Sequence, residues 1–284
     1  MRTTVISRAL DTSPSTREPI FRATTSEIAF AAPCDRTQLL ELLDGYLHAL
    51  RSGDAQRVPC APRMRVTEDG IDTAMGVGLW RAMPGLGAFR HCTADVERGE
   101  IGCLTTLDFA GEPALLSLRL KIEARRICEA ESWLTLRGQA ALFAPENLDP
   151  ALASVEQRLP DALRNTRTEL RVIVDGYFDA IEASDGSNVS LDPECRRFQN
   201  GVPSTVTAST FAGLSHIQRV DRRYCAIDEE RGLVWGIFAF QVPGDENHAP
   251  RTTFVCESFQ ITAGRIRMIT AFSRNMPYGT SSGW

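Results

Sequence analysis

Apolar residues recur at helical spacing in two well-separated segments of the chain, and the two segments resemble each other. The first lies between Asp35 and Gly53, and the second follows Glu169. Residues three and four positions apart share one face of an α-helix, so each stripe predicts an amphipathic helix with one buried side. Asp35 or Thr37 can cap the first helix, and Gly53 can end it. The stripes consist of Leu39, Leu43, Tyr46, Leu47 and Leu50, and of Ile173, Val174, Tyr177, Phe178 and Ile181.

Segments in which apolar and polar residues alternate follow each predicted helix. The clearest is 113–124, where Leu116, Leu118 and Leu120 are separated by polar side chains. Successive side chains of a strand point to opposite faces, so this alternation predicts strands with one apolar face in a curved antiparallel sheet. Turn-forming residues separate the segments. The predicted strands are 63–70, 88–96, 100–109, 113–124 and 126–138, followed by 216–228, 232–242, 252–261 and 265–274.

The order of a helix followed by strands occurs twice, which indicates an internal duplication. DGYLHAL at 44–50 aligns with DGYFDAI at 175–181. We therefore predict the α+β class, as a duplicated cone in which two curved antiparallel sheets each pack on a long N-terminal helix. The predicted organisation is an extended N-terminal arm at 1–33, a first half at 34–143, a linker at 144–165 and a second half at 166–284.

Composition narrows the class of protein. The 284 residues, 43% of them hydrophobic, are enough to bury a sizeable core. The eight cysteines are scattered singly, so we expect free thiols rather than disulfides or structural zinc. The sequence shows no apolar run typical of a signal peptide or a membrane span, which predicts a cytoplasmic protein without a membrane partner. The net charge of −5 includes no basic stripe and argues against nucleic acid as a partner.

The sequence lacks the motifs of cofactor-dependent enzymes. We find no nucleophile elbow, phosphate-binding loop, dinucleotide fingerprint or paired-histidine metal motif. We therefore expect no cofactor and no metal. Lys121 is the only lysine of the chain, so it alone can supply a side-chain amine as a Schiff base or as a general base with a lowered pKa.

Several motifs resemble those of a known family. They are the two heptapeptides above, VTEDG at 66–70, GLW at 78–80, RRFQNGV at 196–202, and the strand pairs around GLVWGIF and GRIRMI. Over residues 33–284 the chain resembles the two-half SnoaL-like family of the nuclear-transport-factor-two-like superfamily. The resemblance implies a cone with an apolar pocket and cofactor-free chemistry on small organic molecules. It extends to the bacterial diarylpropane lyases of lignin-dimer breakdown, which release formaldehyde.

Four residues are the candidates for catalysis. Glu257 alternates in step with Val255 and Phe259, which aims a carboxylate at the apolar side of its strand, where burial raises a carboxyl pKa. Arg274 is expected to pair with Glu257 or to hold a substrate oxygen. Tyr177 lies on a helix stripe, and Lys121 is the lone amine. A purely structural Arg–Glu pair is the competing interpretation for the first two residues.

A second set of residues is expected to bind the substrate. Arg197 and Asn200 fall in a predicted loop near the pocket, although Asn-Gly at this point also fits a simple turn. Only one of Arg222 and Arg223 can face the pocket from a strand. The complete set is Tyr46, Trp80, His91, Arg197, Asn200, His216 and Arg223.

The leading functional hypothesis is a lyase of the elimination or retro-aldol type that acts on a small aromatic or polycyclic substrate. A quinone methide formed from a para-hydroxyaryl diol would serve as the electron sink, so the reaction needs no metal or flavin. The alternatives are an isomerase or cyclase of secondary metabolism and a non-catalytic small-molecule-binding module. The expected assembly is a homo-oligomer, either a dimer or a trimer.

Overall fold

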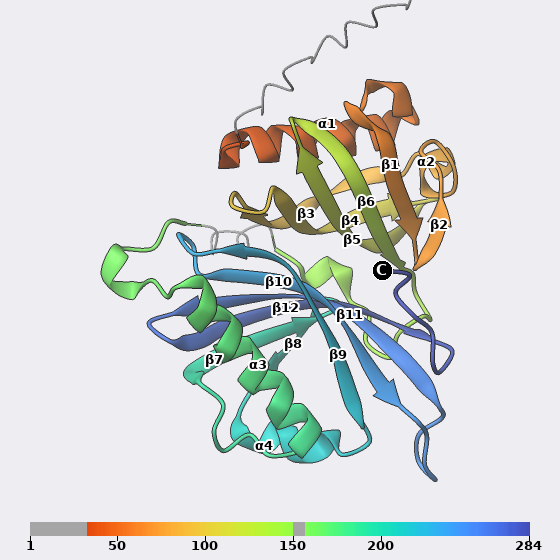
Figure 1. Ribbon diagram of the computed structural model, residues 1–284. Coiled ribbons are helices and arrows are strands. Elements are labelled where there is room, and N and C mark those ends of the chain that lie inside the picture. Colours follow the sequence, from red (N-terminus) through yellow and green to blue (C-terminus); the bar gives the residue numbers. More distant parts are fainter. Residues whose placement is uncertain (1–32, 150–156) are drawn as a thin grey trace, which may run out of the picture. The chain divides into compact units, whose positions relative to one another are not determined.

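The computed structural model describes residues 33–149 and 157–284, and Figure 1 shows the elements that they form. The predicted N-terminal arm lies outside the described residues apart from Pro33, and so does the middle of the predicted linker. No described helix is both long and apolar enough to cross a membrane.

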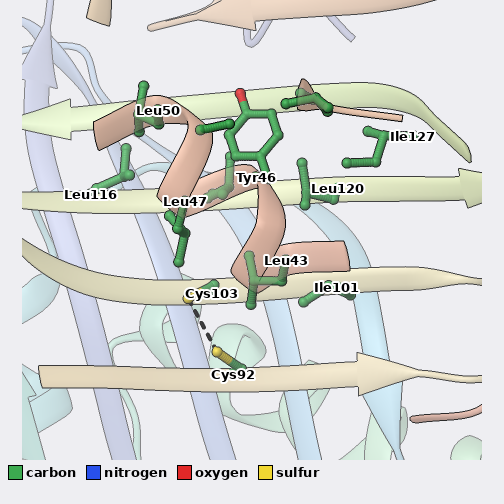
Figure 2. Packing of buried hydrophobic residues seen from close by; sticks show 14 of the residues in the cluster. Leu43, Tyr46, Leu47, Leu50, Cys92, Ile101, Cys103, Leu116, Leu120 and Ile127 are labelled. Atoms are coloured by element: carbon green, nitrogen blue, oxygen red, sulfur yellow. Dashed lines mark hydrogen bonds between the residues drawn. The ribbon is translucent and has the colours of Figure 1, made fainter. Parts of the chain in front are cut away.

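The first predicted helix is α1, Arg36–Ser52, and its ends follow from local chemistry. The Asp35 carboxylate accepts a hydrogen bond from the backbone N–H of Gln38 at 2.8 Å. In return, the Gln38 side-chain oxygen accepts a hydrogen bond from the backbone N–H of Asp35. This capping box satisfies two N–H groups that a helix start leaves free. Gly53 ends the helix with φ +66°, in the left-handed region that favours glycine. Leu43, Tyr46, Leu47 and Leu50 face the first sheet, as Figure 2 shows.

The first sheet has six strands in the order β2-β1-β6-β5-β4-β3. β3 to β6 form an antiparallel meander, while β1 pairs with β6 in parallel and with the short β2 in antiparallel fashion. The bounds are β1 Cys60–Glu68, β2 Ile71–Thr73, α2 Leu79–Ala82, β3 Gly85–Asp95, β4 Glu100–Phe109, β5 Glu112–Glu123 and β6 Arg126–Thr135, with a 3₁₀ turn at Ala55–Arg57.

The second half repeats this arrangement. Its long helix is α3, Arg167–Ala183, which begins with a capping box between Thr166 and Glu169. Its sheet has the order β8-β7-β12-β11-β10-β9, with the same single parallel pair, here between β7 and β12. The bounds are β7 Leu191–Gln199, β8 Val202–Thr205, α4 Ala208–Phe211, β9 Arg219–Asp228, β10 Leu233–Val242, β11 Arg251–Thr262 and β12 Arg265–Met276, with 3₁₀ turns at Pro145–Asn147, Asp161–Leu163 and Ala212–Leu214.

The predicted duplicated α+β cone is therefore confirmed, with one difference in detail. Each sheet is mixed rather than wholly antiparallel, because the strand after the long helix pairs in parallel with the last strand of its half. The first of these pairings joins Glu68 with Ser132, more than 60 residues later in the chain, and local alternation carries no information about it.

One hydrophobic core lies inside each half, and a third joins the two sheets. In the third core, Trp133 of β6 stacks on Phe254 of β11 with ring centroids 4.3 Å apart. Trp235 of β10 lies over Gly102 of β4, where a Cβ atom would collide with the indole ring. Gly102 therefore permits the close approach of the two sheets.

Two ion pairs connect the halves in a reciprocal manner. Arg36, the first residue of α1, binds Asp228, the last residue of β9. Arg167, the first residue of α3, binds Asp95, the last residue of β3. Each contact is the counterpart of the other in the duplicated fold. The two halves thus meet through an interface of the kind found in two-fold symmetric dimers.

Candidate active site

The second half contains a cavity of about 680 Å³ between α3, α4 and the sheet face that α3 covers. Its walls are mainly apolar, with a few polar groups on the same lining, which is the usual character of a small-molecule site. The apolar lining includes Ile181, Val206, Phe211, Ile217, Phe240 and Val255. The polar lining includes Tyr177, Arg197, Gln199, His216, Arg251 and Thr253.

The corresponding space in the first half is filled. There the cavity measures only about 10 Å³. Trp80 is buried against Tyr46 in an edge-to-face contact with ring centroids 5.1 Å apart. Of the two cones in the described residues, only that of the second half therefore has room for a substrate.

Tyr177, Arg197 and Glu257 form the polar centre of the second cone. Arg197 donates from Nε and Nη2 to Oε1 of Glu257, at 3.2 and 3.1 Å. Its guanidinium also lies close enough to the Tyr177 hydroxyl to oppose the rise in the pKa of that hydroxyl. Tyr177 and Arg197 line the cavity, and Glu257 lies directly behind Arg197, next to the inward-facing Val255 on β11. Glu257 is fully buried, and its Oε2 atom has no hydrogen-bond partner among the described residues.

Burial sets the protonation behaviour of this centre. Desolvation raises the pKa of Glu257, and the Arg197 cation opposes that shift without cancelling it. Desolvation also raises the pKa of Tyr177 far above its usual value, so its hydroxyl stays protonated at neutral pH. The centre therefore offers a hydroxyl donor, a fixed cation and a carboxyl group that exchanges its proton more readily near neutrality than an exposed glutamate does.

Further hydrogen bonds hold Arg197 in place. Its Nη1 donates to the Gln199 side chain, which in turn donates to Oγ of Ser273 at 3.2 Å. Ser273 Oγ also accepts a hydrogen bond from the amide of Asn200 at 3.2 Å. A guanidinium fixed on several sides loses little freedom when a ligand binds, which favours a preorganised site.

Two of these three positions differ in the first half. In the first half, Glu68 is paired across the sheet with Ser132, and Ser132 with Leu118. The equivalent pairings in the second half join Gln199 to Ala271, and Ala271 to Glu257. Leu118 is thus the counterpart of Glu257. Counting two residues back from Glu68 and from Gln199 makes Val66 the counterpart of Arg197.

The tyrosine of the centre is common to both halves, because Tyr46 and Tyr177 occupy matching places in the two aligned heptapeptides. At the other two positions, in contrast, a charge pair occurs only in the half with the open cavity. A fold alone does not require such a pair, since Val66 and Leu118 serve in its place in the first half.

Two histidines and an arginine lie near the outer part of the cavity. The His216 and His248 rings stack with centroids 4.2 Å apart, and Nδ1 of His248 lies 2.9 Å from an Asp245 carboxylate oxygen. His216 and Arg251 line the cavity. Burial lowers the pKa of His216, and the nearby His248 and Arg251 add to this effect. His216 is thus a neutral imidazole at neutral pH.

The predicted pairing of Arg274 with Glu257 is wrong. Arg274 instead binds Asp69 and donates to the Leu134 carbonyl oxygen at 2.8 Å. The register of β11 and β12 shifts between Gln260 and Ile261, a β-bulge that reverses the alternation along β12. Met268 and Phe272, which simple alternation places on the same face as Ile266, therefore point to the other sheet, whereas Ile266 lies in the core of the second half.

Lys121 and Arg223 also lie away from the cavity. Lys121 of β5 in the first half lies 3.6 Å from Glu100 and donates to a backbone carbonyl oxygen of Arg98. Arg223 binds the buried Glu131 across the two halves. Both side chains have partners that explain them as structural ion pairs, and neither lines the cavity of the second half.

The remaining predicted binding residues divide between the two cones and the region between the sheets. Tyr46 and Trp80 fill the first cone. The His91 ring is buried between the halves, with Nε2 2.7 Å from Oγ of Ser258. Asn200 supports the turn between β7 and β8, as the Asn-Gly interpretation expected, and donates to the Leu142 carbonyl oxygen at 3.0 Å.

Arg197 and His216 line the cavity, so two predicted binding residues stand where a substrate would lie. Arg197 does so from strand β7 and not from the predicted loop. Gln199 and Arg251 were not predicted. Arg251 lies six residues before Glu257, so the alternation of side chains along the strand that pointed to Glu257 also places Arg251 on the same face. No comparable sequence pattern points to Gln199.

Two possible features receive no support from the described residues. They contain no group of three or more His, Cys, Asp or Glu side chains that could hold a metal ion. All eight cysteines are free, although the Sγ atoms of Cys92 and Cys103 lie 3.2 Å apart on adjacent strands. Figure 2 shows these two thiols within the core of the first half.

Residues 32–133 and 163–273 match the model of a family described as "Domain of unknown function (DUF8021)". The chain belongs to this family. The two matched segments of the DUF8021 model each contain one long helix and most of one sheet. No curated protein matches the chain.

Solved structures with similarity to this DUF8021 chain include nuclear-transport-factor-two-like and SnoaL-like proteins. A nuclear-transport-factor-two-like protein of unknown function from Cytophaga hutchinsonii is 10% identical, covers 34% of this chain and 89% of its own, and gives a TM-score of 0.29. A protein from Kribbella flavida classed as a ketosteroid isomerase is 13% identical, with coverages of 44% and 91% and a TM-score of 0.29. A protein from Jannaschia classed as a SnoaL-like polyketide cyclase is 13% identical, with coverages of 41% and 90% and a TM-score of 0.30. Similarity at this level assigns no activity.

Proposed function

We propose that the protein is a cofactor-independent lyase of the elimination or retro-aldol type, with its active site in the cavity of the second half. The observation that carries the proposal is the buried centre of Tyr177, Arg197 and Glu257 at an apolar cavity, where the first half has Tyr46, Val66 and Leu118 around a filled core. A buried charge pair is costly to a fold, so its presence in only one of the two cones favours a chemical role.

The proposed substrate is a para-hydroxyaryl 1,2-diarylpropane-1,3-diol. In the first step Tyr177 gives its proton to the benzylic hydroxyl, the C–O bond breaks and water leaves. The ring oxygen supplies the electron pair, and its own proton passes through a bridging water to Oε2 of Glu257, which lies behind the cavity wall. A quinone methide results. Arg197 stabilises the negative charge that Tyr177 carries at this stage.

In the second step Tyr177 takes the proton of the primary hydroxyl. The C–C bond to that carbon breaks, formaldehyde leaves, and the bonding electrons return to the ring, which regains its proton from Glu257. The diol has become a stilbene, water and formaldehyde, and both side chains are back in their starting states. General acid–base catalysis of this kind contributes roughly 10²–10⁴-fold to a rate.

A second candidate is an isomerase or cyclase that uses the same groups. A protonated Tyr177 and the Arg197 cation beside it are suited to stabilise an enolate oxygen. A binding module without catalysis is the third possibility, in which Tyr177 and Arg197 would only hold a ligand.

The test is a substrate screen with mass-spectrometric detection and formaldehyde trapping, run on wild type, Tyr177→Phe and Tyr46→Phe. We expect formaldehyde and a stilbene from a diarylpropanediol with wild type, a loss of about 10²–10⁴-fold for Tyr177→Phe, and normal turnover for Tyr46→Phe, its matched control in the filled cone. Rearranged products of unchanged mass would instead favour the isomerase. Equal losses for the two variants would contradict the placement of the site.

A further inference from the structure

The inward face of β11 carries a sequence of side chains that runs the length of the cavity. Arg251, Thr253, Val255 and Glu257 alternate with outward-facing neighbours and so share one face of the strand. The first three line the cavity, and the fourth binds Arg197 behind its wall. The six residue steps from Arg251 to Glu257 span about 20 Å of strand at the usual rise per residue. The cavity therefore has two charged ends that are far apart.

Apart from Thr253, the stretch between the two ends is apolar. Val255, Ile217 and Phe240 line it, together with Val206 and Phe211. Apolar walls favour an apolar ligand body, because binding removes apolar surface from water. A ligand that touches both ends is thus elongated, with an apolar middle.

Arg251 differs from the other arginine at the cavity. Arg197 is neutralised by Glu257, whereas Arg251 forms no ion pair with any carboxylate among the described residues. Its Nη1 donates only to the backbone carbonyl oxygen of Ala249, at 3.3 Å. The nearby Asp245 carboxylate is engaged by His248, from its ring and from its backbone N–H at 2.7 Å. A guanidinium on a cavity wall without a counter-charge is well suited to bind an anionic group.

His216 adds a second polar group beside Arg251. Arg251 lies close enough to His216 to help lower the pKa of that imidazole, and both side chains line the same cavity. The neutral imidazole can donate one hydrogen bond to a carboxylate oxygen while the guanidinium donates to the other.

We infer that the ligand of the second cone is an elongated, largely apolar acid, whose carboxylate binds Arg251 and His216 while its opposite, hydroxylated end meets Tyr177 and Arg197. This inference rests on the proposed function for the identity of the reacting end. It adds a specificity determinant at the other end, namely recognition of a carboxylate by Arg251.

The test measures dissociation constants for two probes that differ only in charge, trans-4-hydroxystilbene-4′-carboxylate and its methyl ester. We expect wild type to bind the acid at least about tenfold more tightly than the ester, because only the acid can accept charge-assisted hydrogen bonds from the Arg251 guanidinium. Arg251→Gln should reduce the preference to within about twofold while the affinity for the ester stays the same. Arg267→Gln, which removes an arginine from outside the cavity, should retain the preference.

Three outcomes would overturn the inference. They are an unchanged acid preference in Arg251→Gln, a wild type without any preference, and a wild type that binds neither probe. Melting temperatures of the variants verify that each is folded. Catalysis is tested separately: an acid preference that depends on Arg251 but is accompanied by no turnover in the substrate screen contradicts the lyase and leaves the ligand class standing. Turnover of uncharged diols without an acid preference supports the lyase and contradicts the inferred ligand class.

Discussion

Arg167 binds Asp95 across the two halves of the chain, and its counterpart Arg36 binds Asp228 in the opposite direction. Each arginine is the first residue of a long helix, and each aspartate is the last residue of an edge strand. Asp95 is fully buried and also accepts hydrogen bonds from the backbone N–H groups of Arg98 and Ile227, both at 3.0 Å. The reciprocal pattern makes the chain resemble a two-fold symmetric dimer joined into one polypeptide.

The reciprocal pairs should be important for stability. Arg167→Gln leaves the Asp95 carboxylate buried without its cation, and removal of one partner of a buried pair costs about 3–5 kcal/mol. Urea denaturation should show this decrease in the free energy of unfolding. Arg219→Gln removes an exposed partner of Asp221 and should cost less than about 1 kcal/mol. Similar losses for the two variants would mean that the contact between the halves does not depend on the buried pair.

His91 should make the protein sensitive to acid. Burial, and secondarily the Arg36 cation, lower the pKa of His91 to about 4, whereas the unfolded chain has the ordinary value of about 6.5. The unfolded state therefore binds more protons between these values, so stability rises with pH across this window and is lost as pH falls from about 6.5 to 4. The loss should reach up to about 3 kcal/mol.

Denaturant titrations at several pH values measure this effect. His91→Gln should flatten the pH dependence between about pH 4 and 6.5, because glutamine does not titrate. The exposed His48 provides the control, and His48→Gln should leave the curve of wild type unchanged. A curve for His91→Gln that is parallel to wild type would show that other groups cause the acid sensitivity.

Trp80 and Phe211 lie in the short helices α2 and α4, which follow the matching strands β2 and β8. The two residues therefore allow the two cones to be compared. Trp80→Ala empties a packed core and should destabilise the protein by about 3–5 kcal/mol, without an effect on turnover at a temperature where the variant is folded. Phe211 lines the open cavity, so Phe211→Ala should also weaken substrate binding, seen as a higher KM. A loss of turnover in folded Trp80→Ala would contradict the assignment of the site to the second half.

The sequence contained enough information for the helices, the duplication and the face of Glu257, because each depends on local periodicity. Leu43 and Tyr46 repeat at helical spacing, and their burial follows directly. Glu257 shares one face of β11 with Val255 and Phe259, and the pairing of β11 with β10 is regular. Local patterns are reliable where no irregularity interrupts them.

Contacts between distant segments were not accessible in this way. A single bulge in β12 placed Arg274 on the wrong face, and nothing in the sequence marks the bulge beforehand. Arg197 was expected in a loop, because the parallel pairing of β7 with β12 joins segments about 70 residues apart. The partner of Glu257 could therefore not be identified before the two strands were seen side by side.

Glu257→Gln tests the proposed chemistry most directly. The substitution retains the shape of the side chain and one oxygen for Arg197, but it removes the titratable proton. If Glu257 exchanges a proton with the substrate, turnover should decrease by roughly 10²–10⁴-fold while the fold persists. Desolvation raises the pKa of Glu257, so the wild-type protein loses stability as pH rises from the ordinary glutamate pKa through the raised one, and the variant should lack this loss.

A structural ion pair makes different predictions for the same variant. Arg197 would then be left as a buried cation beside a neutral amide, the melting temperature would fall, and the remaining activity would follow the folded fraction. Steady-state kinetics at a temperature where both proteins are folded, combined with thermal unfolding from pH 4 to 8, separate the two cases. A folded variant with near-normal turnover and an unchanged pH profile would exclude Glu257 as the proton-exchanging group, because no other change in the site could restore a proton that glutamine cannot carry.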